Sequence, residues 1–297
     1  MPTGEVTSGT LGDALPEIIS DARIVGEYEG VWQRTCDVKK QEEGTGLQWT
    51  QFQLAQIEAQ DISENVPNSN FQQLQGTLIG AEPVMSQVIM KVTDRTYRKI
   101  AKVVSSKFGT LAGNAMARKK DEDYLALFST FATTCSPGTG NPLSHGHIAA
   151  AVANAKGNTA EPAMSSIFSV LHGFQLYDIQ LEVLAPVGTY AIAEGMTEEV
   201  FKNGYEGKCA GSMIFTDGNI NPAGVSSTNG RGATHAREGV FAIKGMEIKT
   251  EKDRDIYFGG GADVISMVDE YAFLENTSRG TQYACYQHVS DCTAPAS

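Results

Sequence analysis

The chain of 297 residues has a formal charge of −12 at neutral pH and contains 41% hydrophobic and 20% charged residues. This composition is typical of a globular protein and excludes an intrinsically disordered chain. The acidic balance argues against a protein that grips nucleic acid or anionic lipid through counterion release.

The cysteines and the amino terminus indicate a cytosolic type of protein. Five scattered cysteines form no C-x-x-C pair, which favours free thiols over a disulfide framework or a zinc site. The first residues show no signal-peptide pattern, and no stretch approaches the roughly 18 apolar residues of a membrane-spanning helix.

The amino-terminal region is expected to form an arm followed by a short helix. Residues 1–12 are rich in Gly, Thr and Ser. From 13 to 31, apolar side chains recur at spacings of three and four, which predicts an amphipathic helix.

The segment 41–90 is the most unusual part of the sequence, because it has no Lys or Arg and carries six acidic residues. Apolar alternation over 47–54 predicts a strand, with a one-residue slip that we interpret as a bulge. A second extended run covers 71–78 and is interrupted by Pro83. The turn-forming sequence NVPNSN at 65–70 separates the two runs. We therefore predict a long hairpin, which is marginally stable unless it lies on another molecule.

A long helix is expected next. Apolar side chains keep a 3.6-residue period over 97–131, and Thr93 or Asp94 can cap the helix. A continuous helix would have roughly 38 residues and a length on the order of 55 Å. Gly109 and Gly113 weaken its middle, so a kink or a split into two helices stays open.

The second half of the chain predicts a mixture of helices and strands. Ser144 can cap a helix that ends at Gly157, and residues 164–183 indicate a buried strand that leads into a helix. Apolar alternation between 240 and 288 predicts a sheet that closes the chain. Turns are expected at the dipeptides Asn203-Gly204, Asp217-Gly218 and Asn229-Gly230.

The residues most typical of a chemical site all have a structural interpretation. His145 and His147 point about 200° apart on a helix, so they do not predict a metal site. His172 follows an apolar run and is interpreted as a hydrogen-bonded structural histidine. The glycine runs at 230–232 and 259–263 lack the dinucleotide and P-loop patterns and are interpreted as flexible loops. The sequence therefore predicts no catalytic, cofactor-binding or metal-binding residue.

The charged block MARKKDEDYLALF, residues 116–128, places three cations at 118–120 directly before three acids at 121–123. Helical spacing pairs them for only about 0.2 to 0.5 kcal/mol each. Three acids at a helix C-terminus would oppose the dipole, so the helix should continue beyond Asp123. We interpret the block as the solvated middle of the long helix. If it faces an enclosed genome, the acids would keep the cations from binding DNA.

A distinctive order runs through residues 15–60, 92–134 and 168–179: an arm with an extended loop, a long helix, and the strand-to-helix sequence FSVLHGFQLYDI. This order resembles the major capsid proteins of tailed phages, which have the Hong Kong 97-like fold. Many relatives have Pro where Gly173 stands. The resemblance covers most of the chain. It rests on the order of the predicted elements and on the general character of these segments rather than on an invariant motif.

The resemblance implies an α+β fold in five parts. These are an N-terminal arm (1–36), an extended E-loop (37–92), a peripheral domain with a long spine helix (93–140), an axial domain (141–243), and closing strands of the peripheral domain with a C-terminal tail (244–297).

The resemblance also implies a structural function and no enzyme activity. Copies would self-assemble as hexamers and pentamers into an icosahedral shell that encloses double-stranded phage DNA. Assembly would occur in the host cytoplasm, and the shell would be the virion capsid. The implied partners are further copies of the chain, a portal, a separate scaffolding protein and a decoration or cement protein, without a membrane or sequence-specific DNA binding. Some relatives form an isopeptide crosslink from an E-loop Lys, and the segment 41–90 contains no Lys, so a noncovalent shell is expected.

Two alternatives stay open at this point. Encapsulins share the fold and form cellular nanocompartments, although the long glutamine-rich loop favours a phage protein. A soluble cytosolic enzyme with an unrecognised site is the alternative from another class.

Overall fold

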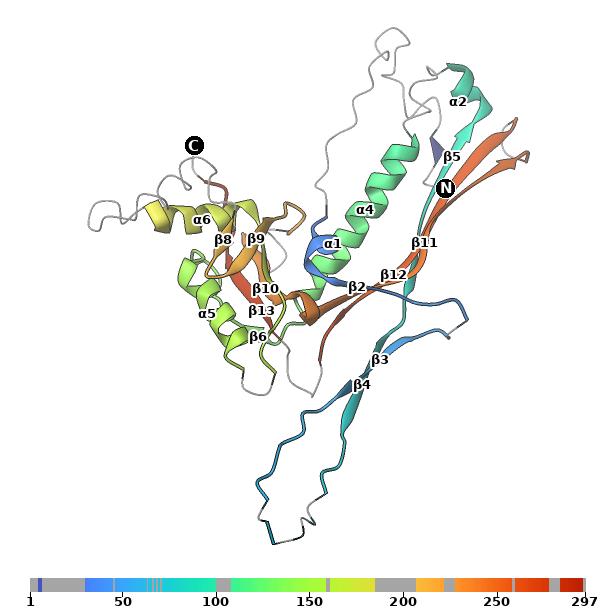
Figure 1. Ribbon diagram of the computed structural model, residues 1–297. Helices are drawn as coiled ribbons and strands as arrows, with labels where there is room; N and C mark the ends of the chain where they lie inside the picture. The colour runs from blue at the N-terminus through green and yellow to red at the C-terminus, as the bar shows by residue number, and fades with distance from the viewer. Residues whose placement is uncertain are drawn as a thin grey trace.

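The protein consists of two β-sheets, five helices within the described residues, and a long hairpin that projects away from both sheets (Figure 1). The mixed α+β class predicted from the sequence is confirmed. The computed structural model describes residues 5–6, 30–44, 46–62, 64–65, 67, 69, 71–99, 108–158, 161–184, 207–221, 228–257, 260–277 and 284–295.

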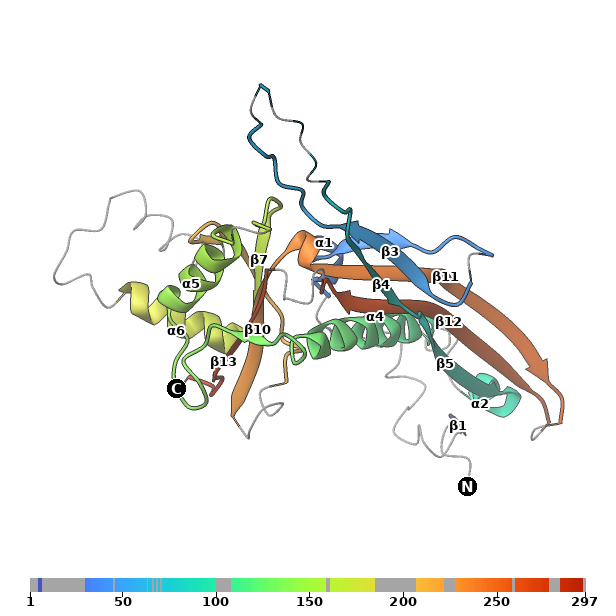
Figure 2. The ribbon, with the colours of Figure 1, turned by 90° about the horizontal axis from the view of Figure 1, so that it is seen from below.

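The first sheet is long and five-stranded, with the strand order β1-β5-β12-β11-β2. Its two longest strands are antiparallel partners along their full length, with register shifts between Lys244 and Lys249. Helix α4 (Phe108–Leu127) runs beside β12 and β5 (Figure 2). The strands are β1 (Glu5–Val6), β2 (Asp37–Lys40), β5 (Val84–Thr93), β11 (Val240–Asp255) and β12 (Ala262–Glu275).

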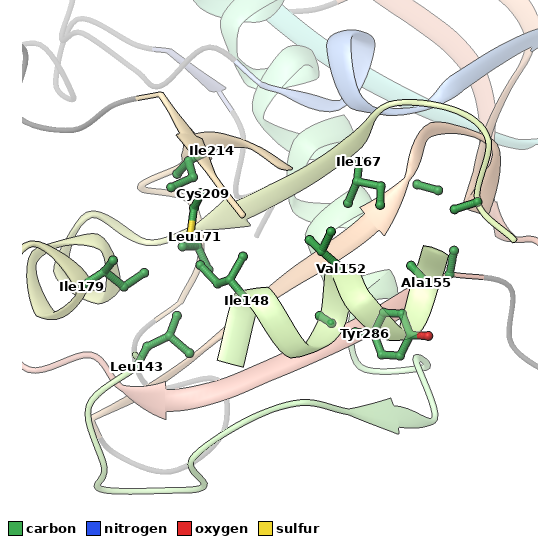
Figure 3. Close-up of a cluster of buried hydrophobic side chains, with 14 of the residues drawn as sticks. Leu143, Ile148, Val152, Ala155, Ile167, Leu171, Ile179, Cys209, Ile214 and Tyr286 are labelled. Atoms are coloured by element: carbon green, nitrogen blue, oxygen red, sulfur yellow. The ribbon is translucent and has the colours of Figure 1, made fainter. Parts of the chain in front are cut away.

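The second sheet has six strands in the order β6-β13-β10-β7-β9-β8. Helix α5 (His145–Lys156) packs on it through Ile148, Val152 and Ala155, and helix α6 (Gly173–Leu184) adds Ile179 to the same core (Figure 3). The strands are β6 (Thr133–Thr134), β7 (Ile167–Leu171), β8 (Lys208–Cys209), β9 (Ser212–Thr216), β10 (Asn229–Ala236) and β13 (Cys285–Asp291).

The two sheets are joined by a direct run of chain and by a shared core. Strand β10 passes through the 3-10 turn η3 (Arg237–Gly239) into β11. Aromatic rings from the end of α4 fill the joint: the ring centroids of Tyr124 and Phe128 are 5.0 Å apart, and those of Phe128 and Phe131 are 5.5 Å apart. All three side chains are fully buried. Burial of each such ring stabilises the fold by about 1.5 to 3 kcal/mol.

The predicted long helix is present as two separate helices within the described residues. Helix α2 (Asp94–Lys99) follows β5 directly, and Thr93 Oγ1 accepts a hydrogen bond from the backbone N of Thr96 at 3.3 Å. The predicted cap at Thr93 is therefore confirmed. Helix α4 has 20 residues and ends at Leu127, before the predicted end of the helix at 131. Residues 100–107, where the predicted helix would continue or split, lie outside the described residues. No break falls at Gly109 or Gly113, because both lie inside α4.

Helices α5 and α6 begin and end close to their predicted positions. Ser144 is the N-cap of α5 and Gly157 is its C-cap. The buried strand that leads into a helix is β7 followed by α6.

Three expectations from the sequence need correction or fall outside the description. Asp217-Gly218 forms a turn as predicted, whereas Asn229-Gly230 begins strand β10. Strand β13 pairs with β10 and β6, although 244–297 was expected to form closing strands of the peripheral domain. The helix expected at 13–31 lies outside the described residues up to 29, as does Asn203-Gly204.

Candidate assembly site

The hairpin predicted at 41–90 is confirmed, and its base contacts the five-stranded sheet. Strands β3 (Trp49–Leu54) and β4 (Gly76–Ala81) pair in continuous antiparallel register from Trp49↔Ala81 to Leu54↔Gly76. The predicted bulge is therefore wrong: Trp49 is half-buried and Phe52 is exposed, so the apparent slip marks side chains on opposite faces of one regular strand. Pro83 lies in the break between β4 and β5, as expected.

Two contacts fix the base of the hairpin to the five-stranded sheet. The rings of Trp49 and Phe241 lie with centroids 5.7 Å apart. The Nε2 group of Gln53 donates a hydrogen bond to Asn276 Oδ1 at 3.1 Å. Beyond this base, both views show the hairpin extending away from the rest of the molecule (Figures 1 and 2).

The hairpin exposes more large apolar side chains than a free surface element normally carries. Seven of them are between 54% and 90% exposed in the single chain. A contiguous apolar surface of this kind is typical of a binding site between proteins. These residues, which we call the hairpin apolar set, are Phe52, Leu54, Ile57, Ile62, Phe71, Leu74 and Leu78.

The charged side chains of the hairpin are all acidic. It contains no Lys or Arg, and the cations that flank it lie in the five-stranded sheet. Lys39 and Lys40 belong to β2, and Lys91 of β5 forms an ion pair with Asp255 at 2.7 Å. No ε-amine is therefore placed on the hairpin itself.

A second group of exposed apolar side chains lies on β5 and at the far turn between β11 and β12. Tyr257 at this turn is 95% exposed, and Ile256 beside it is 68% exposed. Ion pairs stiffen the strands next to the turn: Lys252 Nζ lies 2.7 Å from Asp263 Oδ2. The apolar side chains of β5 are Val84, Met85 and Ile89. The two ends of the long sheet thus both offer apolar surface.

The joint between the sheets contains a series of buried polar side chains that are hydrogen-bonded to one another. Tyr124 OH lies 2.9 Å from Thr35 Oγ1 and 2.7 Å from His235 Nε2. His235 Nδ1 lies 3.0 Å from the carbonyl oxygen of Ala236. Burial lowers the pKa of His235 to about 4, so the ring is neutral at physiological pH. A neutral ring that donates a hydrogen bond from Nδ1 accepts one at Nε2 from the tyrosine hydroxyl. Each polar group in this series then has a hydrogen-bond partner.

The charged block at 116–128 is only half solvated, which corrects the interpretation from the sequence. Arg118 pairs with Glu122, and Lys119 pairs with Asp123, all on the exposed side of α4. Lys120 instead turns inward and pairs with the buried Asp269 of β12.

Asp121 is also buried, where it accepts a hydrogen bond from Asn219 Nδ2 at 2.9 Å. It is therefore not available to face an enclosed genome. The prediction that the helix runs past Asp123 is confirmed, because α4 ends at Leu127.

The histidines weighed as site residues have structural contacts. In α5, His147 Nδ1 lies 2.7 Å from Ser144 Oγ and accepts from the Ser144 backbone N at 3.3 Å, completing a capping box. His145 begins the same helix, and its backbone N donates to the Glu182 carboxylate at 2.6 Å. His172 Nδ1 accepts from the backbone N of Phe174 at 3.1 Å, and partial burial lowers its pKa.

The two glycine runs differ from each other. The run at 259–263 leads from the β11–β12 turn into β12, and Gly260 and Gly261 have φ angles of +92° and +104°. The run at 230–232 lies inside β10, so its interpretation as a flexible loop is wrong. A Cβ on Gly232 would come 2.8 Å from the carbonyl oxygen of Val170, so close sheet packing requires glycine there.

No chemical site emerges from the described residues. They contain no group of three or more His, Cys, Asp or Glu side chains that could hold a metal ion, and all five cysteines are free. No helix in the described part of the chain is long and apolar enough to cross a membrane.

Comparisons of sequence find no relative: no protein-family model matches the chain, and no curated protein matches it. Comparisons of structure do. The chain is similar to a chain in the head structure of Helicobacter pylori bacteriophage KHP40, with a TM-score of 0.69 and 12% identity over 92% of this chain and 94% of that chain. It is similar to the capsid structure of the cyanophage P-SCSP1u, with a TM-score of 0.65 and 12% identity over 93% and 92% of the two chains.

A third similar structure is the capsid of Ralstonia phage GP4, with a TM-score of 0.66 and 10% identity over 94% of this chain and 95% of that chain. The long sheet, the projecting hairpin and these similarities together define a class of fold. The chain has the fold of a phage capsid protein. More closely, it is the Hong Kong 97-like fold of tailed-phage major capsid proteins, as the resemblance in the sequence implied.

Proposed function

We propose that this chain is the major capsid protein of a tailed phage and that its copies assemble as hexamers and pentamers into an icosahedral shell around double-stranded DNA. The observation that supports this proposal is the hairpin apolar set, which is exposed on a chain with a phage capsid fold. A two-stranded hairpin is marginally stable alone. If each hairpin lies over a neighbouring copy, its apolar side chains are removed from water at about 25 cal/mol per Å².

The shell is proposed to be noncovalent. The hairpin has no Lys that could form an amide bond with a neighbour, and the nearest lysines belong to strands of the five-stranded sheet. Assembled particles boiled in denaturant should therefore run as a single band at the mass of one chain, 31.8 kDa. A ladder of covalent oligomers on the gel would refute the proposal.

The proposed partners follow from the same assembly. They are further copies of the chain, a portal, a separate scaffolding protein and a decoration or cement protein. Assembly takes place in the host cytoplasm and produces the virion capsid. The net charge of −12 supports enclosure of DNA without binding it, because an acidic wall repels phosphate groups.

The five parts expected from the resemblance remain our proposal for the domain organisation, with one adjustment. The arm, E-loop, peripheral domain and axial domain keep the ranges 1–36, 37–92, 93–140 and 141–243. Within 244–297, we assign β13 to the axial domain, since it pairs with β10 in the six-stranded sheet.

Electron microscopy of the expressed full-length protein tests the assembly directly. We expect shells or ring-shaped capsomers. The matched variant replaces the hairpin tip at 56–74 with a short Gly-Ser linker, which leaves the base contacts of Trp49 and Gln53 in place. This variant should fold but not form shells. A wild-type protein that stays a monomer and turns over small metabolites would refute the proposal and support the enzyme alternative.

A further inference from the structure

A buried pair of carboxyl groups lies where α4 meets the turn after β9. Asp121 of α4 and Asp217 of this turn have no exposed surface. Asn219 orients both: its Nδ2 group donates to Asp121 Oδ2 at 2.9 Å, and its backbone N donates to Asp217 Oδ1 at 2.8 Å. One oxygen of each carboxyl, Asp121 Oδ1 and Asp217 Oδ2, has no donor among the described residues.

No cation neutralises the pair. None of the ion pairs within the described part of the chain includes either carboxyl, and Lys120, the neighbour of Asp121, is paired with Asp269. The nearby titratable groups are Cys36, directly after helix α1 (Trp32–Thr35), and Tyr124 of α4, and both are neutral because burial raises the pKa of each. On the open side, Glu122 of α4 and Arg231 of β10 line a surface cavity together with Asn219.

Gly30, two residues before α1, closes the space on one side of Asp121. A Cβ on Gly30 would lie only 2.7 Å from Asp121 Oδ1. This close backbone leaves no room for a hydrated cation on that side of Asp121 Oδ1. Two ionised carboxylates in such a place would repel each other strongly, because the interior screens charge poorly.

A single proton removes both problems, since it satisfies both unpartnered oxygens with one hydrogen bond. We propose that Asp121 and Asp217 share one proton, and that this proton fastens α4 to the six-stranded sheet and makes the joint sensitive to pH. Geometry supports this, because Asn219 donates one hydrogen bond to each carboxyl group and so holds the two groups close together. The pKa of Asp217 agrees: burial first, and the hydrogen bond to Asp121 second, raise it from 3.8 to about 7.

The direction of the pH effect follows from this raised pKa. The folded protein holds the proton more tightly than the unfolded chain does, so the stabilisation is complete below the unfolded pKa of 3.8. It is lost as the pH rises toward about 7. Above that pH the two carboxylates are both charged, and the joint between the sheets is weakened.

Thermal unfolding of the full-length protein between about pH 5 and about pH 8 tests the shared proton. Asp217→Asn is the decisive variant, because its amide can donate to Asp121 Oδ1 at every pH and still accept from the Asn219 backbone. The wild-type melting temperature should fall as the pH rises, and in this variant the fall should be smaller by about 5 °C. Glu122→Gln removes an exposed carboxyl from the same helix and should keep the full wild-type fall.

A separate measurement protects the test if Asp217→Asn fails to fold. Burial also raises the pKa of Glu275 to about 7, so Glu275→Gln removes a second carboxyl of the described residues that is protonated in this pH range. Infrared spectra of Glu275→Gln should still show the carbonyl stretch of a protonated carboxyl group that disappears near neutral pH. Absence of that signal, or an Asp217→Asn variant with the wild-type pH dependence, would overturn the proposal. Stabilisation of the wild type by Ca²⁺ above neutral pH, lost in Asp217→Asn, would overturn it in favour of a cation site. These readouts concern the folded chain, so they stand whether or not shells form.

Discussion

Replacing Phe71 with Ser should impair assembly while leaving the single chain intact. Phe71 is 90% exposed, so the isolated fold gains almost nothing from it. Burial of a phenylalanine side chain against a neighbour contributes about 1.5 to 3 kcal/mol. Loss of this contribution corresponds to about a 10- to 100-fold weaker association at each contact, since every 1.4 kcal/mol is tenfold. In a closed shell every copy makes the contact, so the protein concentration needed for assembly should rise at least as much.

The assay is light scattering across a concentration series, with electron microscopy of the products and thermal unfolding of the unassembled protein. Phe71→Leu is the matched control, because it keeps an apolar side chain and should assemble nearly as well as the wild type. The melting temperature of the unassembled Phe71→Ser variant should stay within about 1 °C of wild type. Normal assembly of Phe71→Ser, or a large loss of stability in the unassembled chain, would refute the assignment of the hairpin as the contact surface.

Three further predictions test the fold around the joint. Gly232→Ala forces a Cβ to 2.8 Å from a backbone oxygen and should cost about 1 to 3 kcal/mol of unfolding free energy in denaturant titrations. Lys120→Met leaves Asp269 buried and unpaired, so it should cost about 3 to 5 kcal/mol. Lys119→Met breaks only an exposed pair and should change stability by less than about 1 kcal/mol; equal effects at the two lysines would contradict the observed burial. Glu275→Gln should remove up to about 3 kcal/mol of the loss of stability between pH 4.5 and about 7, because burial raises the pKa of Glu275 over that range.

Periodicity and composition were sufficient to predict the hairpin. Its defining signal, fifty residues without a cation, is a property of the sequence alone. The bulge was wrong because both the half-buried and the exposed face of β3 carry apolar side chains, so apolar residues do not mark a single face of this strand. Phe52 and Leu54 point away from the sheet, where a partner rather than the subunit's own core would select apolar side chains.

The interior of the charged block could not be predicted, because its partners are distant in sequence. Asp269 and Asn219 meet α4 only when β12 and the turn after β9 are packed around it. Pairing within the helix was a reasonable default and is correct for Arg118 and Lys119. At Lys120 and Asp121, tertiary contacts override it, and no local pattern distinguishes these two positions from their neighbours.

The Asn229-Gly230 dipeptide shows the same limit for backbone structure. Its local preference is for a tight turn. In the protein, a Cβ on Gly230 would lie 3.0 Å from Cys292 Sγ, so the residue is a glycine because of close packing. Backbone freedom and small size are both properties of glycine, and the sequence alone does not say which of them a position uses.

The distribution of polar and apolar groups separates the two tasks of this molecule. Polar and charged side chains such as Asp121, Asp269 and His235 are buried in and around the joint, where each depends on a specific partner or a shared proton. Large apolar side chains such as Phe71 and Tyr257 are exposed at the extremities, where the subunit gives them nothing to pack against. Buried polar networks fix one geometry, because a displaced member is left unsatisfied at high cost. Exposed apolar surface, in contrast, gains free energy only from a neighbour. A chain built in this way holds a defined angle between its sheets and, in the proposed shell, would gain its remaining hydrophobic stabilisation from contacts with other copies.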